Sequence, residues 1–295
     1  MAMITPERLL AAGTMTDPTP PKLLVDGLAV RYESAAPGQY ACQGIEFRLE
    51  PGDRLTVLGP TGCGKSTMLK AIAGYLPIAA GRVEVSGRAV SAPGQDRFVM
   101  FQEFDQLFPW QTIRSNIVYA LKARTKRRSE KMRASEMSTR ADELLSMVGL
   151  AGRGDLYPGE CSGGMKQRVA LARALAISPE VLLLDEPFGA LDAQTRRRLQ
   201  EQLLGLCERL DTTILFVTHD IPEAVMIGNR IMMMSAAGRV TNIYEAENHD
   251  QVALEEHLRD ELRSNQTRGP GAQNPTDASA PPKRAGLLGW AKGWR

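Results

Sequence analysis

The sequence predicts an α/β fold built around a largely parallel sheet. Three short runs, 181–184, 213–217 and 230–234, are almost entirely apolar, as is typical of strands buried on both faces. Helical patterns at 165–176 and 193–210 stand before two of these runs. Because strands that alternate with helices usually pair in parallel, these observations favour the α/β class.

The first part of the chain adds strands and a long helical region. Strands are predicted at 23–31, 45–49, 54–58, 82–85 and 98–101. A helix over 65–73 ends at Gly74, and a helical pattern runs from about 112 to 150. The basic residues within 122–133 are interpreted as a solvated helix face, with contact to lipid headgroups or a partner as the alternative.

Both ends of the sequence differ in composition from the centre. Residues 1–21 contain Pro18, Pro20 and Pro21, and we expect a flexible leader there. A carboxy-terminal helix is predicted at 246–264, followed by a disordered tail at 265–295 that is rich in Gly, Pro and Ala. Trp290 and Trp294 lie in this tail beside basic residues. The tail could therefore contact a membrane surface, or it could have no function.

Composition and charge exclude several classes of protein. Of 295 residues, 43% are hydrophobic, and the formal net charge of +2 gives no reason to expect a nucleic-acid partner. The four cysteines, Cys42, Cys63, Cys161 and Cys207, form no CxxC pair, which favours a reducing compartment. No apolar stretch is long enough to span a bilayer, and the first residues lack the pattern of a secretory signal.

A phosphate-binding loop follows the strand at 54–58. Residues 59–66 read GPTGCGKS and match G-x-x-x-x-G-K-[ST], between a predicted strand and a predicted helix. Glycines let the backbone approach phosphate oxygens, and amides at the helix start face their charge. We expect Lys65 to reach the β- and γ-phosphates of a nucleotide, Ser66 to ligate Mg²⁺ and Thr67 to contact the α-phosphate. The candidate residues of this segment are Gly59, Pro60, Thr61, Gly62, Cys63, Gly64, Lys65, Ser66 and Thr67.

The strand at 181–184 ends in two acids. Ligands of open α/β sheets bind at the carboxyl ends of the strands, where Asp185 and Glu186 would lie. We expect Asp185 to hold Mg²⁺ and Glu186 to orient and polarise an attacking water. Helix capping alone would also explain such a pair, but the phosphate loop upstream favours the catalytic interpretation.

A second glycine-rich helix start separates this chain from other phosphate-loop proteins. Residues 161–168 read CSGGMKQR, and Ser162, Gly163 and Gly164 precede a predicted helix. Such a helix start can bind phosphate. Because one nucleotide does not need two of these sites in one chain, we predict a head-to-tail dimer in which the segment of one chain caps the nucleotide of the other.

With these motifs in this order, residues 22–245 resemble the ATP-binding cassette (ABC) family. The resemblance implies a P-loop NTPase (RecA-like) core with an antiparallel β subdomain and an inserted α-helical subdomain at about 103–167. It also implies hydrolysis of ATP with Mg²⁺. The family signature is LSGGQ or LSGGM, so Cys161 replaces the usual leucine and puts the packing beneath the signature in question.

The same resemblance assigns four further residues. Gln102 in RFVMFQ matches the glutamine that senses Mg²⁺ and the transmembrane partner, and Asp192 in GALD matches the loop that crosses the dimer interface. His219 in LFVTHD matches the histidine that contacts the γ-phosphate, and Tyr32 in VRYES matches the aromatic that stacks on adenine, with Tyr40 as the competing aromatic. The implied catalytic set is Lys65, Gln102, Glu186 and His219, and the implied metal set is Ser66, Gln102 and Asp185.

A finer resemblance is to the cassettes of nitrate, sulfonate and taurine importers. It rests on QEFDQLFPWQTIRSNIVYAL, YPGECSGGMKQRVALARAL and THDIPEAVMIGNRIMMMS. It implies a second ATPase subunit, permease subunits and, indirectly, a substrate-binding protein, with the chain peripheral on the cytoplasmic face of the inner membrane. The apolar segment with Phe104, Leu107, Phe108 and Trp110 would line a groove for a permease helix, or form the core of the helical subdomain.

Three other functions would leave features of this sequence unexplained or would require features that it lacks. A non-transport ABC ATPase acting on DNA or ribosomes would carry a long coiled coil or two cassettes, whereas only 120 positions separate Lys65 from Asp185. A catalytically weak regulatory cassette is compatible with Cys161 but not expected with Glu186 and His219 intact. A soluble small-molecule kinase leaves CSGGM unexplained.

Overall fold

The structure of the chain is a computed structural model. It describes residues 20–36, 38–101, 106–129, 131–189, 191–210, 212–246 and 250–267. Most of the predicted leader (1–21) and tail (265–295) lies outside these residues, as do Gln102, Phe104, Trp290 and Trp294. In the described part of the chain, no helix is long and apolar enough to cross a membrane.

A six-stranded sheet forms the centre of the molecule. Its order is β10-β9-β3-β8-β7-β6, and every neighbouring pair is parallel except β10 with β9. Alternate residues of β7 enter different cores, Leu183 on one face and Leu182 on the other, which explains why the strand is apolar throughout. The six strands are β3 (Arg54–Leu58), β6 (Arg97–Met100), β7 (Val181–Asp185), β8 (Thr213–Val217), β9 (Arg230–Met234) and β10 (Val240–Glu245).

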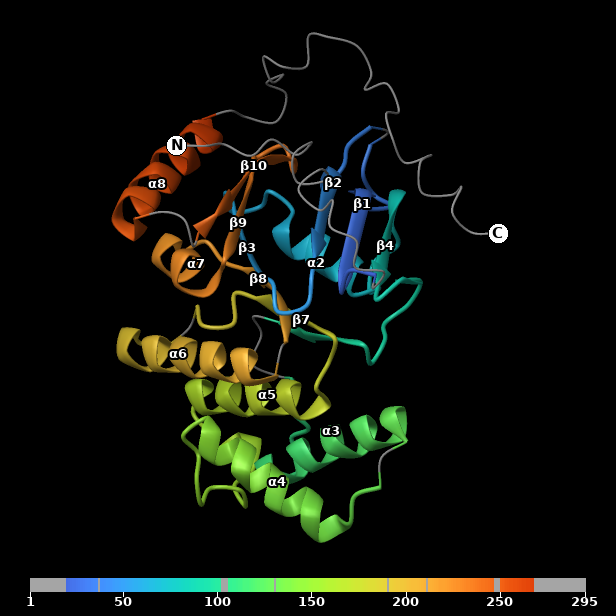
Figure 1. Cartoon of the computed structure of the whole chain (residues 1–295), viewed down its shortest axis with the longest axis vertical. Coiled ribbons are helices and arrows are strands. Elements are labelled where there is room, and N and C mark those ends of the chain that lie inside the picture. Colours follow the sequence, from blue (N-terminus) through green and yellow to red (C-terminus); the bar gives the residue numbers. More distant parts are fainter. Residues whose placement is uncertain are drawn as a thin grey trace.

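A smaller antiparallel sheet covers one face of the central sheet. Its order is β2-β1-β4-β5, and helix α2 (Lys65–Ile72) packs between the two sheets in a shared apolar core (Figure 1). Here β1 pairs with β2 and with β4 in antiparallel register. The strands are β1 (Leu23–Val30), β2 (Cys42–Leu49), β4 (Ala80–Val85) and β5 (Arg88–Ala89).

Helices cover the other face in two layers (Figure 1). The helices α5 (Gly163–Ile177) and α6 (Ala193–Leu210) lie against the sheet, and α3 (Ile113–Arg128) and α4 (Ala134–Met147) lie beyond them. The predicted helical region at 112–150 is therefore two helices. Thr112 begins α3 by accepting a hydrogen bond from the Ser115 amide, and Ser129 ends it in the left-handed conformation.

Two helices at the far edge complete the fold. The short helix α7 (Ile221–Ile227) is not predicted from the sequence, and α8 (Gln251–Thr267) lies in the region where a helix is expected at 246–264. Both pack with β9 and β10 around a third apolar cluster. The helix α7 begins because Asp220 accepts a hydrogen bond from the Glu223 amide and Pro222 occupies the first turn.

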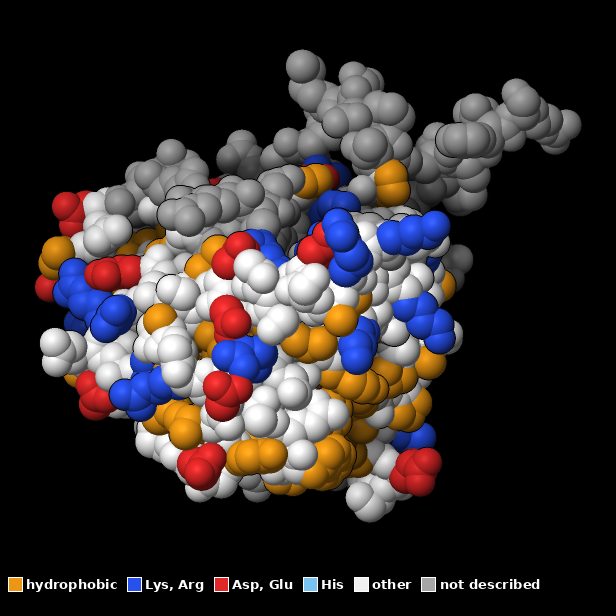
Figure 2. Space-filling view, turned by 90° about the horizontal axis from the view of Figure 1, so that it is seen from below, with side chains coloured by type: hydrophobic (Ala, Val, Ile, Leu, Met, Phe, Trp, Pro, Cys, Tyr) orange, Lys and Arg blue, Asp and Glu red, His pale blue; other side chains and the backbone are white. Residues whose placement is uncertain are grey.

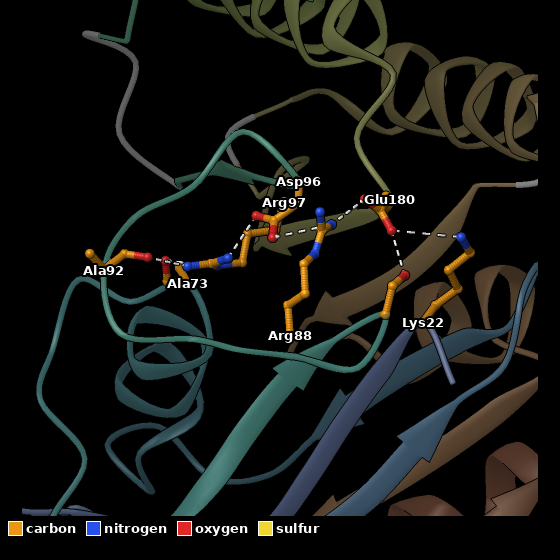
Figure 3. A network of polar contacts seen from close by, with 8 residues as sticks. Lys22, Ala73, Arg88, Ala92, Asp96, Arg97 and Glu180 are labelled. Carbon is orange, nitrogen blue, oxygen red and sulfur yellow. Dashed lines mark hydrogen bonds and ion pairs between the residues drawn. The ribbon is translucent and has the colours of Figure 1, made fainter. Parts of the chain in front are cut away.

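A polar network joins the small sheet to the start of β7 (Figure 3). The Glu180 carboxylate accepts hydrogen bonds from the Ser86 hydroxyl and from Arg88, and lies 3.7 Å from the Lys22 ammonium. Partial burial opposes ionisation, but the Ser86 hydrogen bond and the two cations outweigh it and lower the pKa of Glu180. The network fixes the amino end of the strand whose other end carries Asp185.

Candidate nucleotide-binding site

The phosphate loop needs glycine at two positions for steric reasons. Gly64 precedes α2 with φ of 98°, and a Cβ atom there would lie 2.2 Å from the Ala41 carbonyl oxygen. A Cβ atom at Gly59 would lie 2.8 Å from the Met234 carbonyl oxygen. The loop backbone is therefore held against two neighbouring segments, with its amide groups at the start of α2.

Lys65 lies inside this loop. Its ammonium donates hydrogen bonds to the carbonyl oxygens of Gly59, at 2.7 Å, and Pro60, at 2.9 Å. The Cys63 sulfur is 3.9 Å from the same ammonium, and burial raises the pKa of this thiol. Cys63 is thus a buried, protonated part of the loop rather than a nucleophile.

Ser66 and Asp185 meet at the carboxyl edge of the sheet. The Ser66 hydroxyl donates a hydrogen bond of 2.9 Å to Asp185 Oδ1. Burial raises the pKa of Asp185, and the hydrogen bond from Ser66 opposes this shift. A hydroxyl and a carboxylate side by side are oxygen ligands of the kind that Mg²⁺ prefers. The donor set fits this ion.

Glu186 and His219 form a pair next to the loop. His219 Nδ1 lies 3.1 Å from Glu186 Oε2. Glu186 has a positive φ of 46°, which is uncommon for a residue with a side chain, and its amide donates to the Val217 carbonyl at 2.9 Å. Such a conformation costs on the order of 1 kcal/mol and is often found at functional sites. The sequence carries no signal for this backbone strain.

One cavity of about 1150 Å³ joins these groups. Tyr32 and Tyr40 both line it, and the Tyr32 hydroxyl makes a 2.8 Å hydrogen bond with Thr67 Oγ1. Sequence reasoning missed Ser34, Gln39 and other lining residues, because their turn has no motif of its own. The complete lining is Tyr32, Ser34, Ala35, Gly38, Gln39, Tyr40, Ala41, Gln43, Thr61, Gly62, Gly64, Lys65, Ser66, Thr67, Glu186, His219, Ala236 and Ala237.

The predicted residues of the second phosphate site do not line this cavity. Ser162 accepts a hydrogen bond from the Met165 amide and so caps α5, of which Gly163 and Gly164 form the first turn. Asp192 is exposed and accepts a hydrogen bond from the Thr195 amide at the start of α6. A single chain therefore brings together the phosphate loop, Asp185, Glu186, His219 and Tyr32, but not the signature segment.

Cys161 is accommodated at the leucine position of the signature. Its side chain is buried in the helical core, and its thiol donates to the Tyr157 carbonyl oxygen at 3.4 Å. Burial raises the pKa of the thiol, so it remains protonated. The smaller side chain thus has a hydrogen-bond partner beneath the capping Ser162.

The family match, the relatives and the solved structures that resemble this chain all point to the same protein family. The ABC transporter family matches residues 42–189, which is half of the chain. The aliphatic sulfonates import ATP-binding protein SsuB of Bacillus subtilis is 48% identical over 194 residues, covering 66% of this chain and 72% of that protein. The taurine import ATP-binding protein TauB of Rhizobium johnstonii is 45% identical over 203 residues, covering 68% of this chain and 74% of that protein.

One longer relative and one solved structure complete the comparison. The nitrate import ATP-binding protein NrtC of Synechococcus elongatus is 42% identical over 228 residues, or 76% of this chain, but the match spans only 34% of NrtC. The bacterial ABC transporter cassette MJ0796, solved as a dimer, superposes with a TM-score of 0.68 at 29% identity and covers 77% of this chain and all of the MJ0796 chain. The predicted α/β P-loop fold is confirmed, and the chain belongs to the ABC transporter family.

Proposed function

We propose that this chain is the ATP-hydrolysing subunit of an ABC importer. The observation that carries the proposal is that Lys65, Ser66, Glu186 and His219 line a single cavity at the carboxyl edge of the sheet, with Asp185 bonded to Ser66. A group for each part of phosphoryl transfer to water is thus present: phosphate binding, metal ligation and water activation.

The chain's own residues divide the chemistry among them. Glu186 accepts the proton of the attacking water, and His219, 3.1 Å away, contacts the γ-phosphate from the same side. Lys65 exchanges its two loop carbonyls for phosphate oxygens. Bound Mg²⁺ supplies positive charge to the phosphates, and Ser66, Asp185 and Gln102 are the residues proposed to hold it. Tyr32, bonded to Thr67 at the cavity wall, stacks on the adenine.

The site is completed by a second copy of the chain. Ser162, Gly163 and Gly164 stand at a helix start outside their own chain's cavity, where their amides are free to face the nucleotide of a partner. Asp192, exposed at the start of α6, belongs to the same interface. The solved structures of the MJ0796 cassette, whose fold this chain shares, are dimeric, which supports dimerisation. The head-to-tail orientation is our proposal.

The permease contacts an aromatic surface at the helical end of the molecule. Figure 2, which looks onto that end, shows apolar side chains gathered on one part of the face. Trp110 is 71% exposed and Tyr119 is 54% exposed, and both rings contact Phe108, over which the Arg173 guanidinium lies. Exposed aromatics around a cation are typical of protein interfaces. This contact would hold the chain on the cytoplasmic face of the inner membrane.

The cargo is proposed from the relatives alone. Curated relatives at 42–48% identity carry the names nitrate, aliphatic sulfonates and taurine import ATP-binding proteins. We propose transport of a small anion of this kind, delivered by a substrate-binding protein and moved by separate permease subunits. The cargo does not contact this chain, so none of its residues selects it.

The decisive experiment is ATP hydrolysis by the purified chain as a function of its own concentration. Because two chains build each site, the specific activity is expected to rise with concentration below the dimer dissociation constant and then to level off. Chelation of Mg²⁺ should abolish the activity. Hydrolysis at a constant specific activity would contradict the shared site, and its absence at every concentration would favour the regulatory cassette.

Replacement of Tyr32 by Ala is expected to weaken ATP binding about tenfold, the size of one lost base-stacking contact. Tyr32→Phe keeps the ring and loses only the hydrogen bond to Thr67, so its affinity should stay within about threefold of the wild type. Tyr40→Ala is the matched control, because Tyr40 lines the same cavity. Titration with a fluorescent ATP analogue gives the three affinities. A larger loss in Tyr40→Ala would make Tyr40 the adenine contact instead.

A further inference from the structure

A buried carboxyl group lies behind His219. Glu223 on α7 is only 6% exposed, and its carboxyl oxygens accept hydrogen bonds from the Thr218 hydroxyl and from Gln200 Nε2 at 2.9 Å. Burial raises the pKa of Glu223, while the hydrogen bonds from Thr218 and Gln200 oppose this shift. The proposed chemistry assigns Glu223 no role, and a buried carboxyl is costly unless its partners are fixed.

Hydrogen bonds that involve Glu223 hold the residues on both sides of His219. Thr218 precedes His219, and its hydroxyl also accepts a hydrogen bond from the Asp220 amide at 3.0 Å. The Asp220 carboxylate in turn accepts from the Glu223 amide at 2.9 Å. The backbone on both sides of His219 is therefore fixed by one closed set of contacts. The His219 side chain is 61% exposed, so its direction depends on this backbone and on its contact with Glu186 more than on packing.

The other end of the same contacts lies on α6. Gln200 and Arg196 are four residues apart on this helix and so project from the same face. Arg196 donates to the Leu191 carbonyl oxygen at 3.0 Å and lies 3.7 Å from the Asp220 carboxylate. Leu191 is next to Asp192, the proposed interface residue. Two side chains of α6 thus join the segment around Asp192 to the segment around His219.

We infer that Glu223 is a positioning residue that sets the direction of His219 and couples it to helix α6. The inference rests on the proposed function, since it concerns the same hydrolytic site. A displacement of the segment at Asp192 would reach His219 through Gln200 and Glu223, because both hydrogen bonds of the Glu223 carboxyl group are buried. Removal of the carboxyl would release His219 without changing any atom that contacts the nucleotide.

The test compares Glu223→Ala with Glu223→Gln in the full chain. Glu223→Ala is expected to lower kcat about tenfold or more with KM for ATP within about twofold, because the contact of His219 with the γ-phosphate acts mainly in the chemical step, while the phosphate loop and Tyr32 provide most of the ATP binding. Glu223→Gln keeps one acceptor oxygen for the Gln200 amide, and its own amide can donate to the Thr218 hydroxyl, which can also accept. Its kcat should therefore stay within about threefold of the wild type. Leu258→Ala is the control, since Leu258 belongs to the apolar cluster around α7 but makes none of these hydrogen bonds.

A double-mutant cycle with Gln200→Ala measures whether the losses of kcat in the two variants are additive. A general loss of stability would not make them non-additive. If Gln200 acts through Glu223, the double variant should lose no more kcat than Glu223→Ala alone. Additive losses, a fall in Leu258→Ala equal to that in Glu223→Ala, or a parallel rise in KM would each overturn the positioning role. The proposed function fails separately, through absence of hydrolysis in the wild-type chain.

Discussion

Glu186→Gln is expected to lower ATP hydrolysis by about a hundredfold or more, the contribution typical of a general base. The amide keeps the size of the side chain and its neighbourhood with His219 Nδ1, but it cannot accept the proton of the attacking water. ATP binding should remain, since Lys65 and Tyr32 are unchanged. The variant should therefore accumulate as an ATP-bound dimer. Phosphate release and light scattering with MgATP measure the two effects.

The control for this variant lies at the other end of the same strand. Glu180→Gln removes a carboxylate that holds the amino end of β7 through Ser86 and Arg88, far from the cavity. Because the ion pairs there are partly exposed, turnover should change by about threefold or less. If Glu186→Gln keeps more than a tenth of the wild-type rate, or Glu180→Gln loses as much, Glu186 is not the base.

The buried strands of the central sheet could be predicted because their apolar runs are continuous, whereas β10 (Val240–Glu245), which is only partly buried, was not predicted. The bounds of β3, β8 and β9 match the predicted runs, and β7 extends one residue further to include Asp185. Sequence motifs located the phosphate loop and the acidic pair Asp185 and Glu186. They could do so because few residue types can bind phosphate and Mg²⁺ at these fixed positions. The same reasoning reached His219 only through family resemblance, since a single histidine after a strand carries no chemical signal of its own.

Other features depend on contacts that no local pattern encodes. The predicted helical region at 112–150 breaks at Ser129, whose left-handed backbone cannot be read from a basic, helix-favouring run. Glu186 has a positive φ and donates its amide hydrogen bond to Val217 on the neighbouring strand, a contact between segments far apart in the sequence. Glu223 reads as an ordinary helix residue, and only the packing of α7 against α6 makes it a buried acceptor.

The second large effect is expected for Gly64→Ala, which should weaken ATP binding strongly and lower the stability of the fold. The new Cβ atom would lie 2.2 Å from the Ala41 carbonyl oxygen, a backbone atom that cannot turn aside. The left-handed φ of 98° adds about 1 kcal/mol for any residue with a Cβ atom. Together with overpacking, we expect the free energy of unfolding to fall by about 2–4 kcal/mol.

Gly44→Ala is the control that separates the effect of the steric clash from the effect of the positive φ. Gly44 also has a positive φ, of 63°, but a Cβ atom there meets nothing within 4 Å, and the residue lies outside the phosphate loop. The Gly44→Ala variant should lose about 1 kcal/mol of stability and no ATP affinity.

Relief of the clash at Gly64 requires the loop to move away from Ala41, which withdraws the amides at the start of α2 from the phosphates. The affinity for ATP, measured well below the unfolding temperature of each variant, should therefore fall about a hundredfold in Gly64→Ala, about 2.7 kcal/mol. Equal affinities in the two variants would mean that the loop binds phosphate without the backbone position that this contact enforces.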